Sequence, residues 1–442
     1  MLRPLGAVAI IVGIVIGAGI FKTPSMVASV TGDIGWLVLI WCAGAIISLA
    51  GALCYAELST AYPHAGGDYH FLSLAYGKNI SFLYAWAKAM VINTGSVALL
   101  AFVFGDYMSK VIPLGDGSSV IWAAGIIVTL TLINIIGLHI SSHLQSVLTG
   151  LEVTGLVVII IAGFFFTAPV GPQPDAFSAT PPIGLMGLAL VFVLLTFGGW
   201  NEAAYISSEV KGGVKTIVPV IIASLLLITV IYLLVNLALL SGLGFKGLAD
   251  SKAPGADLLK AAFGPLGEKA IGVFVAVATL TSINATLIVG ARANYALGKD
   301  WPTLRFLGSW QAHRGSPTAA YISQGAISLA LVAFGALQTS GFESMVEFTA
   351  PVFWSFLCLV GIAVFVLRVR DRGAHRPFRI PLYPLTPIVF TTSCGYLAYS
   401  SVTYAQSKGA LHISLGVMLF GVAALVIMML GARGARASSD QT

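Results

Sequence analysis

The sequence predicts an all-α membrane protein with twelve transmembrane helices. Of its 442 residues, 57% are hydrophobic and only 9% are charged, and the mean hydropathy is +0.94. Soluble globular proteins carry about 25% charged residues, so this composition excludes an ordinary soluble enzyme, a coiled coil and a disordered protein. The hydrophobic residues run from one end of the chain to the other, which also excludes a single anchor attached to a large soluble domain.

Each predicted span satisfies one requirement, a stretch of about 20 mostly apolar residues. The first six segments that meet it are 5–31, 35–61, 80–109, 118–137, 143–168 and 184–209. The second six are 215–241, 267–296, 318–338, 345–368, 384–405 and 410–431. Because the number of spans is even, both termini are expected on the same side of the membrane.

The basic residues predict which side that is. Of the 23 lysines and arginines, fifteen fall in loops on the side of the N-terminus and six on the opposite side. Two more, Lys22 and Lys88, lie within spans. Lysine and arginine are enriched in cytoplasmic loops, so both termini are predicted to be cytoplasmic. The net charge of +6 is assigned to this asymmetry and not to nucleic acid binding, because no basic stripe is present.

Glycines interrupt the first and the sixth span. The first reads GIVIGAGIF over residues 13–21, and the sixth reads TFGGWNEAAY over residues 196–205. Glycine lowers helix stability by about 1 kcal/mol, and interrupted spans at matching positions of two inverted halves indicate the binding site of a transporter. Close helix packing is the alternative. It suits Gly13 and Gly17, four residues apart, better than the adjacent pair Gly198 and Gly199.

Four motifs resemble the amino acid–polyamine–organocation superfamily of transporters, and in particular its L-type amino acid transporter branch with the bacterial relatives. They are VAIIVGIVIGAGIFKTP (8–24), GALCYAELSTAYPHAGGDYHFL (51–72), FGGWNEAAYISSEVK (197–211) and RPFRIPLYP (376–384). The resemblance implies the LeuT-like fold, a five-plus-five inverted repeat with broken first and sixth helices. The repeats would be 1–168 and 184–368, followed by two peripheral helices in 384–431 and a short cytoplasmic tail, 432–442.

The resemblance also implies an amino acid held by its two charged ends. The carboxylate would meet the backbone N–H groups of Gly17, Ala18 and Gly19. The ammonium would meet carbonyl groups of both breaks, near Ile14, Ile16, Leu195, Thr196, Phe197 and Gly198. Many relatives gate the site with an aromatic residue at the position of Leu195. The nearest aromatic here is Phe197, so either residue is a candidate for the gate.

The side-chain pocket implied by the same resemblance is lined by Ile92, Ser96, Leu195, Leu280 and Asn284. Asn284 is either a polar contact to the substrate or a hydrogen bond between helices. No cluster of charges faces this pocket, which favours a neutral substrate.

Ionisable residues inside spans are costly and often functional. We expect Lys22 to reach outer water and Lys88 to extend toward the cytoplasm. Glu57 is expected to pair with a cytoplasmic arginine. Glu202 would cap or gate the second half of the sixth span.

Glu152 stands where many relatives carry a lysine, in the fifth span. One hypothesis is a protonation switch that couples transport to protons. The alternatives are a carboxylate that pairs with Lys88 or binds a cation, and a purely structural hydrogen bond.

These features predict a secondary transporter or exchanger of neutral L-amino acids that works by alternating access, in a bacterial inner membrane. The alternatives are a cationic amino acid or polyamine antiporter and a sensor that does not transport. The sequence offers no catalytic, cofactor or metal motif. The four cysteines lie in apolar runs, and the loop from Lys110 to Ser119 holds none. We therefore expect no heavy-chain subunit of the kind that animal relatives bind through a cysteine there.

Overall fold

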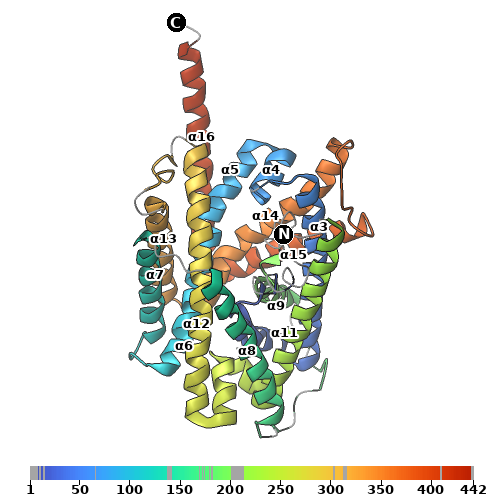
Figure 1. The fold of residues 1–442 in the computed structure, drawn as a ribbon, viewed down its shortest axis with the longest axis vertical. Helices are drawn as coiled ribbons and strands as arrows, with labels where there is room; N and C mark the ends of the chain where they lie inside the picture. The colour runs from blue at the N-terminus through green and yellow to red at the C-terminus, as the bar shows by residue number, and fades with distance from the viewer. Residues whose placement is uncertain are drawn as a thin grey trace.

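The protein is all-helical in the parts that the structure, a computed structural model, describes (Figure 1). These parts are residues 8, 11–12, 15–64, 66–136, 142–168, 170–171, 173, 175–178, 180, 183–200, 214–301, 304–311, 316–408 and 411–439. The first half contains η1 (Ala18–Phe21), α2 (Thr23–Thr31), α3 (Ile34–Ala61), α4 (Asp68–Tyr76), α5 (Lys78–Ala87), η2 (Lys88–Ile92), α6 (Asn93–Val111), α7 (Ser118–Ile136), α8 (Ser142–Phe165) and α9 (Ile183–Thr196). The second contains α11 (Val214–Asp250), α12 (Pro254–Asp300), α13 (Thr318–Ala336), α14 (Gly341–Arg370), α15 (Leu385–Lys408) and α16 (Leu411–Ser439).

Every predicted span overlaps one or more of these helices. Seven helices in the described ranges are long and apolar enough to cross a membrane, or eight when α15 and α16, which meet at a bend of 116°, are taken together. The helices α8 and α9 contribute shorter apolar stretches, Gly150–Phe165 and Gly184–Thr196. The protein is therefore a multi-pass membrane protein, and the full number of twelve spans stays a prediction.

Glycines set the bends of two long helices. In α11 the backbone leaves the helical conformation at Gly244, where φ is 71°, and in α12 it does so at Gly264, where φ is 69°. Positive φ is readily accessible only to glycine. Pro265 follows the second bend, so the straight part of α12 begins there, close to the predicted start of the span at residue 267.

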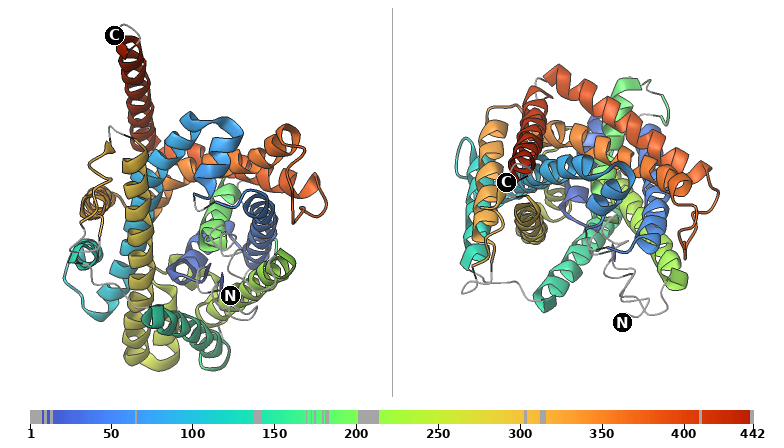
Figure 2. Two further views of the ribbon diagram at one scale, coloured as in Figure 1. Left: turned by 45° about the horizontal axis from the view of Figure 1, so that its top comes forward. Right: turned by 90° about the horizontal axis from the view of Figure 1, so that it is seen from above.

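Two short helical pieces lie at the centre of the bundle. Figure 2 shows α2 (indigo) and α9 (light green) side by side, surrounded by longer helices. A small residue also lets α3 pack closely on α9: a Cβ added at Gly44 of α3 would collide with Val193 of α9. The centre of the molecule is therefore built around the two chain segments that the glycines interrupt.

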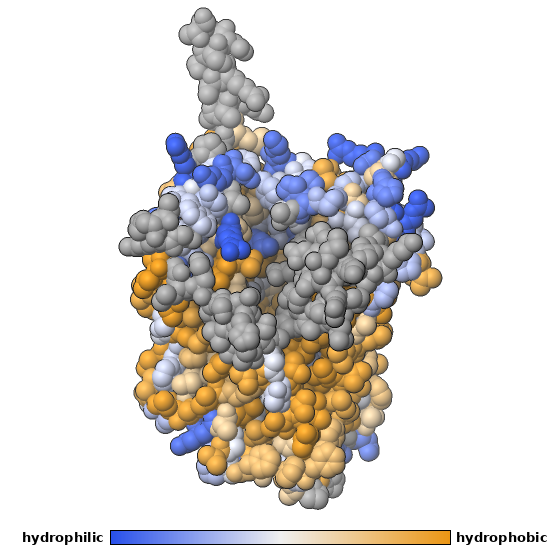
Figure 3. All heavy atoms as spheres, viewed as in Figure 1, coloured by the Kyte–Doolittle hydropathy of each residue, from blue (hydrophilic) through white to orange (hydrophobic). Residues whose placement is uncertain are grey.

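The surface is divided along the long axis of the molecule. Hydrophilic residues gather at the end where α4 and α5 lie, at the top of the view, and hydrophobic surface covers most of the part below (Figure 3). The loop between α14 and α15 carries the exposed Arg372 and Arg379 at this hydrophilic end. Such a band of apolar surface beside a basic end suits a protein that lies in a bilayer.

Candidate functional site

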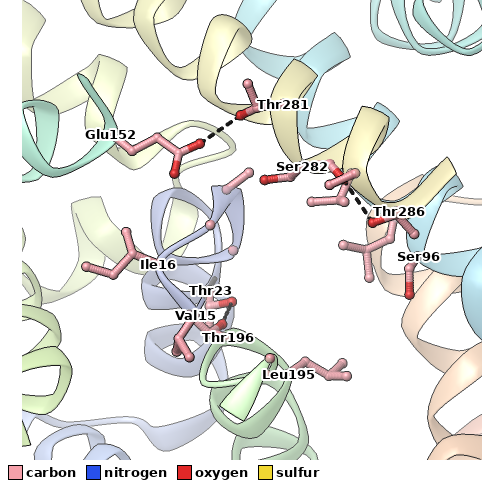
Figure 4. Close-up of a pocket in the computed structure, with 18 of the residues that line it drawn as sticks. Val15, Ile16, Thr23, Ser96, Glu152, Leu195, Thr196, Thr281, Ser282 and Thr286 are labelled. Atoms are coloured by element: carbon pink, nitrogen blue, oxygen red, sulfur yellow. Dashed lines mark hydrogen bonds between the residues drawn. The ribbon is translucent and has the colours of Figure 1, made fainter. Parts of the chain in front are cut away.

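A cavity of about 390 Å³ lies between the two interrupted segments and helices α6 and α12 (Figure 4). Its described lining includes Val15 to Gly19 of the first interruption and Leu195, Thr196, Gly198 and Gly199 of the second. Helix α6 contributes Asn93 and Ser96, helix α12 contributes Thr281, Ser282 and Thr286, and α8 contributes Glu152. Most of this wall is uncharged.

The first interruption is a real loss of α-helix. The chain is irregular at Ile16 and Gly17, continues as the 3₁₀ helix η1 and resumes as α2 at Thr23. No side chain caps the N-terminus of η1 or of α2. Helix N-termini leave backbone N–H groups without intrahelical partners, so the chain presents donors here. A Cβ added at Gly17 would lie 3.6 Å from the Ser282 hydroxyl across the cavity.

The second interruption follows α9, which ends at Thr196. The next three residues form a turn, and Gly199 has a φ of 102°, a conformation that requires glycine in practice. The hydroxyls of Thr196 and Thr23 are 2.6 Å apart, so the two interrupted segments are joined by a direct hydrogen bond. Gly19 permits this contact, because a Cβ there would lie only 3.3 Å from the Thr196 hydroxyl.

Tyr232 of α11 ties the same two segments together from behind. Its buried hydroxyl lies 3.1 Å from the carbonyl oxygen of Val15 and 3.2 Å from that of Thr196. Carbonyl groups released at a helix break need partners when water is absent. Tyr232 thus supplies one donor where both breaks would otherwise leave acceptors unpaired.

Glu152 is the one acidic side chain in the described lining of the cavity. Its Oε1 accepts a hydrogen bond of 2.9 Å from the hydroxyl of Thr281, and Figure 4 shows the carboxyl group pointing toward the first interruption. No contact with Lys88 is present in the part of the chain that the structure describes. Lys88 lies instead with its Nζ 6.0 Å from the ring centre of Tyr84.

The structure brings most of the predicted site residues together. The cavity is lined by Ile16, Gly17, Ala18, Gly19, Ser96, Glu152, Leu195, Thr196 and Gly198. Ile14 and Glu202 lie outside the described residues. Ile92, Phe197, Leu280 and Asn284 are described and do not line the cavity.

The reasons differ among these four residues. Phe197 follows the end of α9 and packs against Trp41 and Tyr232, with ring centroids 6.0 and 5.1 Å away. Of the two candidates for the gate, Leu195 is therefore the one at the cavity. The Asn284 side chain accepts a hydrogen bond of 2.7 Å from Asn134 of α7, which is the interhelical alternative.

The remaining two residues are displaced by helix register. Leu280 and Asn284 share one face of α12, whereas the cavity meets the face that carries Thr281, Ser282 and Thr286. Ile92 ends the π-helical turn η2, and the next residue, Asn93, lines the cavity instead. The polar pair Ser282 and Thr286, four residues apart in an apolar helix, is the sequence signal that would have indicated the correct face.

An ion pair joins the segment of the first break to helix α6. Lys22 is 3% exposed, and its Nζ donates to Asp106 of α6 at 2.8 Å and to the carbonyl of Lys252 at 2.6 Å. Ser119 of α7 donates to the same carboxylate at 2.7 Å. We call Lys22, Asp106, Ser119 and Lys252 the Lys22 cluster. The expectation that Lys22 reaches water was wrong, because an ion partner is available within the protein.

A second ion pair lies at the hydrophilic end of the molecule. Glu57 of α3 is 2% exposed and accepts hydrogen bonds from both Nε and Nη2 of Arg368 on α14. The backbone N–H of Ile380 donates to the same carboxylate at 2.7 Å, and Arg376 Nε is 3.7 Å away. We call these four residues the Glu57 cluster. The prediction that Glu57 pairs with an arginine is confirmed.

Comparisons with known proteins identify the family. The family model described as "Amino acid permease" matches residues 2–430. The chain is 28% identical over 386 residues to the mouse b(0,+)-type amino acid transporter 1, covering 86% of this chain and 78% of that protein. It is 27% identical over 421 residues to the serine/threonine exchanger SteT of Bacillus subtilis (strain 168), covering 93% of both.

The human cystine/glutamate transporter is similar to the same extent, with 27% identity over 406 residues that cover 90% of this chain and 79% of that protein. The matched residues include both glycine-interrupted segments and the helices around the cavity. The relatives are transporters and not enzymes. The chain therefore belongs to the amino acid permease family, within the amino acid–polyamine–organocation superfamily of membrane transporters.

Proposed function

We propose that this protein is a secondary transporter or exchanger that carries neutral L-amino acids across the bacterial inner membrane by alternating access. The observation that carries the proposal is a cavity bounded by two interrupted helices that present their backbone to the same space. An amino acid has a negative and a positive end, and free N–H and carbonyl groups of a broken helix complement these two ends without any charged side chain.

The carboxylate would bind the N–H groups at Gly17, Ala18 and Gly19. The ammonium would bind carbonyl groups at Ile14, Ile16 and Gly198, because Phe197, which was expected with them, does not line the cavity. The carbonyl of Leu195 already accepts a bond of 3.2 Å from the N–H of Gly198, and that of Thr196 faces Tyr232. The first break therefore carries most of the proposed ammonium site.

The proposed orientation places the Lys22 cluster on the outer side and the Glu57 cluster and both termini in the cytoplasm. Val289, which lines the cavity from α12, is 40% exposed, whereas Lys22 beside the first break is buried. This difference suits a cavity that opens to the cytoplasm. Twelve spans in two inverted repeats, 1–168 and 184–368, complete the proposed architecture, with 384–431 peripheral and 432–442 a tail.

The orientation has a direct test. In a variant without the four native cysteines, Ser439→Cys should react with a thiol reagent that does not cross membranes only after the cells are opened. A cysteine that replaces Ser119 of the Lys22 cluster serves as the opposite control for reagent access. Efficient labelling of Ser439→Cys on intact cells would reverse the orientation.

The neutral substrate is favoured by the charges around the cavity. No lysine, arginine or histidine is among the described lining residues, and the single carboxyl group of Glu152 is engaged by Thr281. A cationic amino acid or polyamine antiporter would need acidic groups that face the substrate side chain. Counterflow with labelled arginine, putrescine and neutral amino acids distinguishes these classes, and a sensor would bind without any counterflow.

Glu152 is the proposed site of proton coupling. A protonated carboxyl group would donate to a carbonyl of the first break, and its loss of the proton would place a carboxylate against those oxygens. We expect Glu152→Gln to retain substrate exchange and to lose the response of uptake to a proton gradient. Equal responses of the wild type and the variant would assign Glu152 a structural role. No protein partner is part of this proposal, since the loop after α6 offers no cysteine.

The binding site itself is tested by filling it. Gly17→Ala adds a methyl group at ordinary contact distance from Ser282, in a backbone conformation open to alanine, so the variant should fold. The methyl group would occupy the space of the substrate, and counterflow should fall to background. Gly125→Ala is the matched control, because a Cβ there meets nothing within 4 Å on the exposed face of α7. Normal counterflow by Gly17→Ala would place the substrate elsewhere.

A further inference from the structure

One side chain at the cavity has a polar atom without a partner. Asn93 is 7% exposed, lines the cavity, and its buried Nδ2 has no hydrogen-bond partner among the described residues. Several other buried polar atoms in those ranges also lack partners, but none of them belongs to a residue that lines the cavity. A buried donor without a partner is costly. We therefore expect the amide to form a hydrogen bond with a molecule that enters the cavity.

The backbone holds Asn93 in this position. The residue begins α6 directly after the π-helical turn Lys88–Ile92, and π-helical turns are frequent at functional sites. The opposite side of the helix is fixed by packing, since a Cβ added at Gly95 would collide with Thr349 of α14. The neighbouring Thr94 hydroxyl bonds to the carbonyl of Met90 at 2.8 Å. The amide of Asn93 is therefore the part of this segment left for the cavity.

Two hydroxyls without a hydrogen-bond partner among the described residues line the same cavity. Ser96 lies one turn further along α6, and the hydroxyl of Ser282 on α12 points toward the first helix break (Figure 4). Neither hydroxyl has a hydrogen bond within the described part of the protein, whereas Thr286 bonds to the Ser282 carbonyl at 2.9 Å. Helix α6 thus offers an amide and a hydroxyl to the cavity, and α12 offers the hydroxyl of Ser282 beside the first helix break, where the backbone site for the ends of the substrate is proposed.

We propose that Asn93 recognises the substrate side chain through a hydrogen bond, and that the cavity selects serine and threonine over amino acids of the same shape without a hydroxyl. This inference rests on the proposed function and assigns its substrate class. A hydroxyl both donates and accepts, so it pairs with the amide whichever of its two atoms faces the cavity. A methyl group pairs with neither and leaves the amide buried and unsatisfied.

The charges around the cavity also argue against amino acids with an acidic side chain. An acidic side chain would enter a cavity whose described lining holds a carboxyl group and no cation, and the ammonium of Lys22 is engaged by Asp106 and the Lys252 carbonyl. Sites that bond a hydroxyl reject analogues without it far more strongly than apolar pockets reject an extra methylene. We expect at least about a tenfold preference for threonine over valine, two side chains of nearly equal shape.

The test compares threonine with valine, and serine with 2-aminobutyrate, as competitors of counterflow in proteoliposomes. The wild type should prefer the hydroxyl in both pairs. Asn93→Leu keeps the branching and size of the side chain and removes the amide, so the preference should fall to about onefold, with valine and 2-aminobutyrate bound more tightly. If Asn93 has only a structural role, Asn93→Leu should weaken the binding of all four competitors equally and preserve the two preference ratios.

Asn284→Leu is the matched control, because it removes a buried amide that is paired with Asn134 outside the cavity. It should lower thermal stability and leave both ratios unchanged. If Asn93→Leu does not fold, Asn93→Ala removes the same group without adding volume. Equal affinities for threonine and valine in the wild type would overturn the inference and leave the proposed function standing, whereas absence of counterflow with every amino acid would overturn both.

Discussion

The two ends of the bundle use the same chemistry for different purposes. At each end a buried charged residue pairs with a partner from a helix far away in sequence: Lys22 with Asp106, and Glu57 with Arg368. The Lys22 cluster adjoins the helix break itself, and the ring of Phe342, which lines the cavity, is 6.0 Å from the Lys22 ammonium. None of the residues in the Glu57 cluster lines the cavity.

The balance of charge differs in the same way. The Lys22 cluster holds one ammonium and one carboxylate, with neutral partners from Ser119 and the Lys252 carbonyl. The Glu57 carboxylate is surrounded by Arg368, Arg376 and the Ile380 N–H, and the Arg368 guanidinium also lies 3.7 Å from the ring centre of Tyr383. A pair with few bonds beside the cavity can open during transport. A carboxylate held from several directions is suited to fastening α3, α14 and the following loop permanently.

The largest effect is expected at the Glu57 end. Glu57→Ala leaves two guanidinium groups without their carboxylate in a partly buried place, and breaking a buried pair by removing one partner costs about 3–5 kcal/mol. The midpoint of thermal unfolding in detergent should fall strongly, with exchange per folded molecule little changed. Glu57→Gln keeps one acceptor oxygen, so its midpoint of thermal unfolding should fall less. A variant as stable as the wild type but unable to exchange would make this cluster a gate.

At the Lys22 end we expect a smaller effect on stability and a larger effect on the access of external reagents to the cavity. Lys22→Met removes the ammonium and keeps the length of the side chain. Hydrogen bonds to charged groups contribute about 1.5–3 kcal/mol, and 1.4 kcal/mol corresponds to a tenfold change in population. The outward-open state should therefore be populated at least about tenfold more often.

Labelling of a cysteine at Ser282 reports that population. In a background without Cys42, Cys54, Cys358 and Cys394, an impermeant thiol reagent added outside should react with Ser282→Cys faster when Lys22→Met is present. Glu57→Gln in the same background is the control and should leave the rate unchanged. If both variants accelerate labelling equally, the contrast between the two ends does not hold.

The sequence predicted the positions of the helices well because the membrane imposes one simple requirement, a long apolar stretch. It also predicted the two interruptions, since Gly17 and Gly199 are costly inside a helix and are used where the helix ends. The cavity residues on the first break followed directly, because three consecutive positions, Gly17 to Gly19, face the same space.

The sequence did not predict how the other helices are rotated. Helix α12 is apolar on most sides, and only the polar pair Ser282 and Thr286 marks the face at the cavity, which differs from the face of Leu280. In the third span a π-helical turn adds a residue to one turn, and Asn93 takes the place expected for Ile92. Phe197 lies beyond the last turn of α9, where helical spacing no longer applies. These outcomes depend on tertiary packing, which one span does not encode.

The smallest effect concerns protons, and it belongs to the Glu57 end. Helix α4 is bonded to α14 there through the Tyr76 hydroxyl, which donates to the Leu359 carbonyl at 2.8 Å. The ring of His70 on α4 stacks on that of His64 at a centroid distance of 4.1 Å. Burial, and secondly the neighbouring His64, lowers the pKa of His70 below its ordinary value of 6.5. The folded protein therefore binds this proton less readily than the unfolded chain does.

The sign of the pH effect follows from that difference. The unfolded state binds more protons below pH 6.5, so stability rises with pH. The contribution of His70 is complete above that value and is lost as the pH falls through it toward the lower pKa of the folded state. Because His70 is partly exposed, the unfolding midpoint should drop by only about two degrees between pH 8 and pH 5.5. His70→Gln should remove that drop and leave the pH response of uptake intact. If the uptake response disappears instead, protons act on transport through the Glu57 end, and the division of roles between the two ends fails.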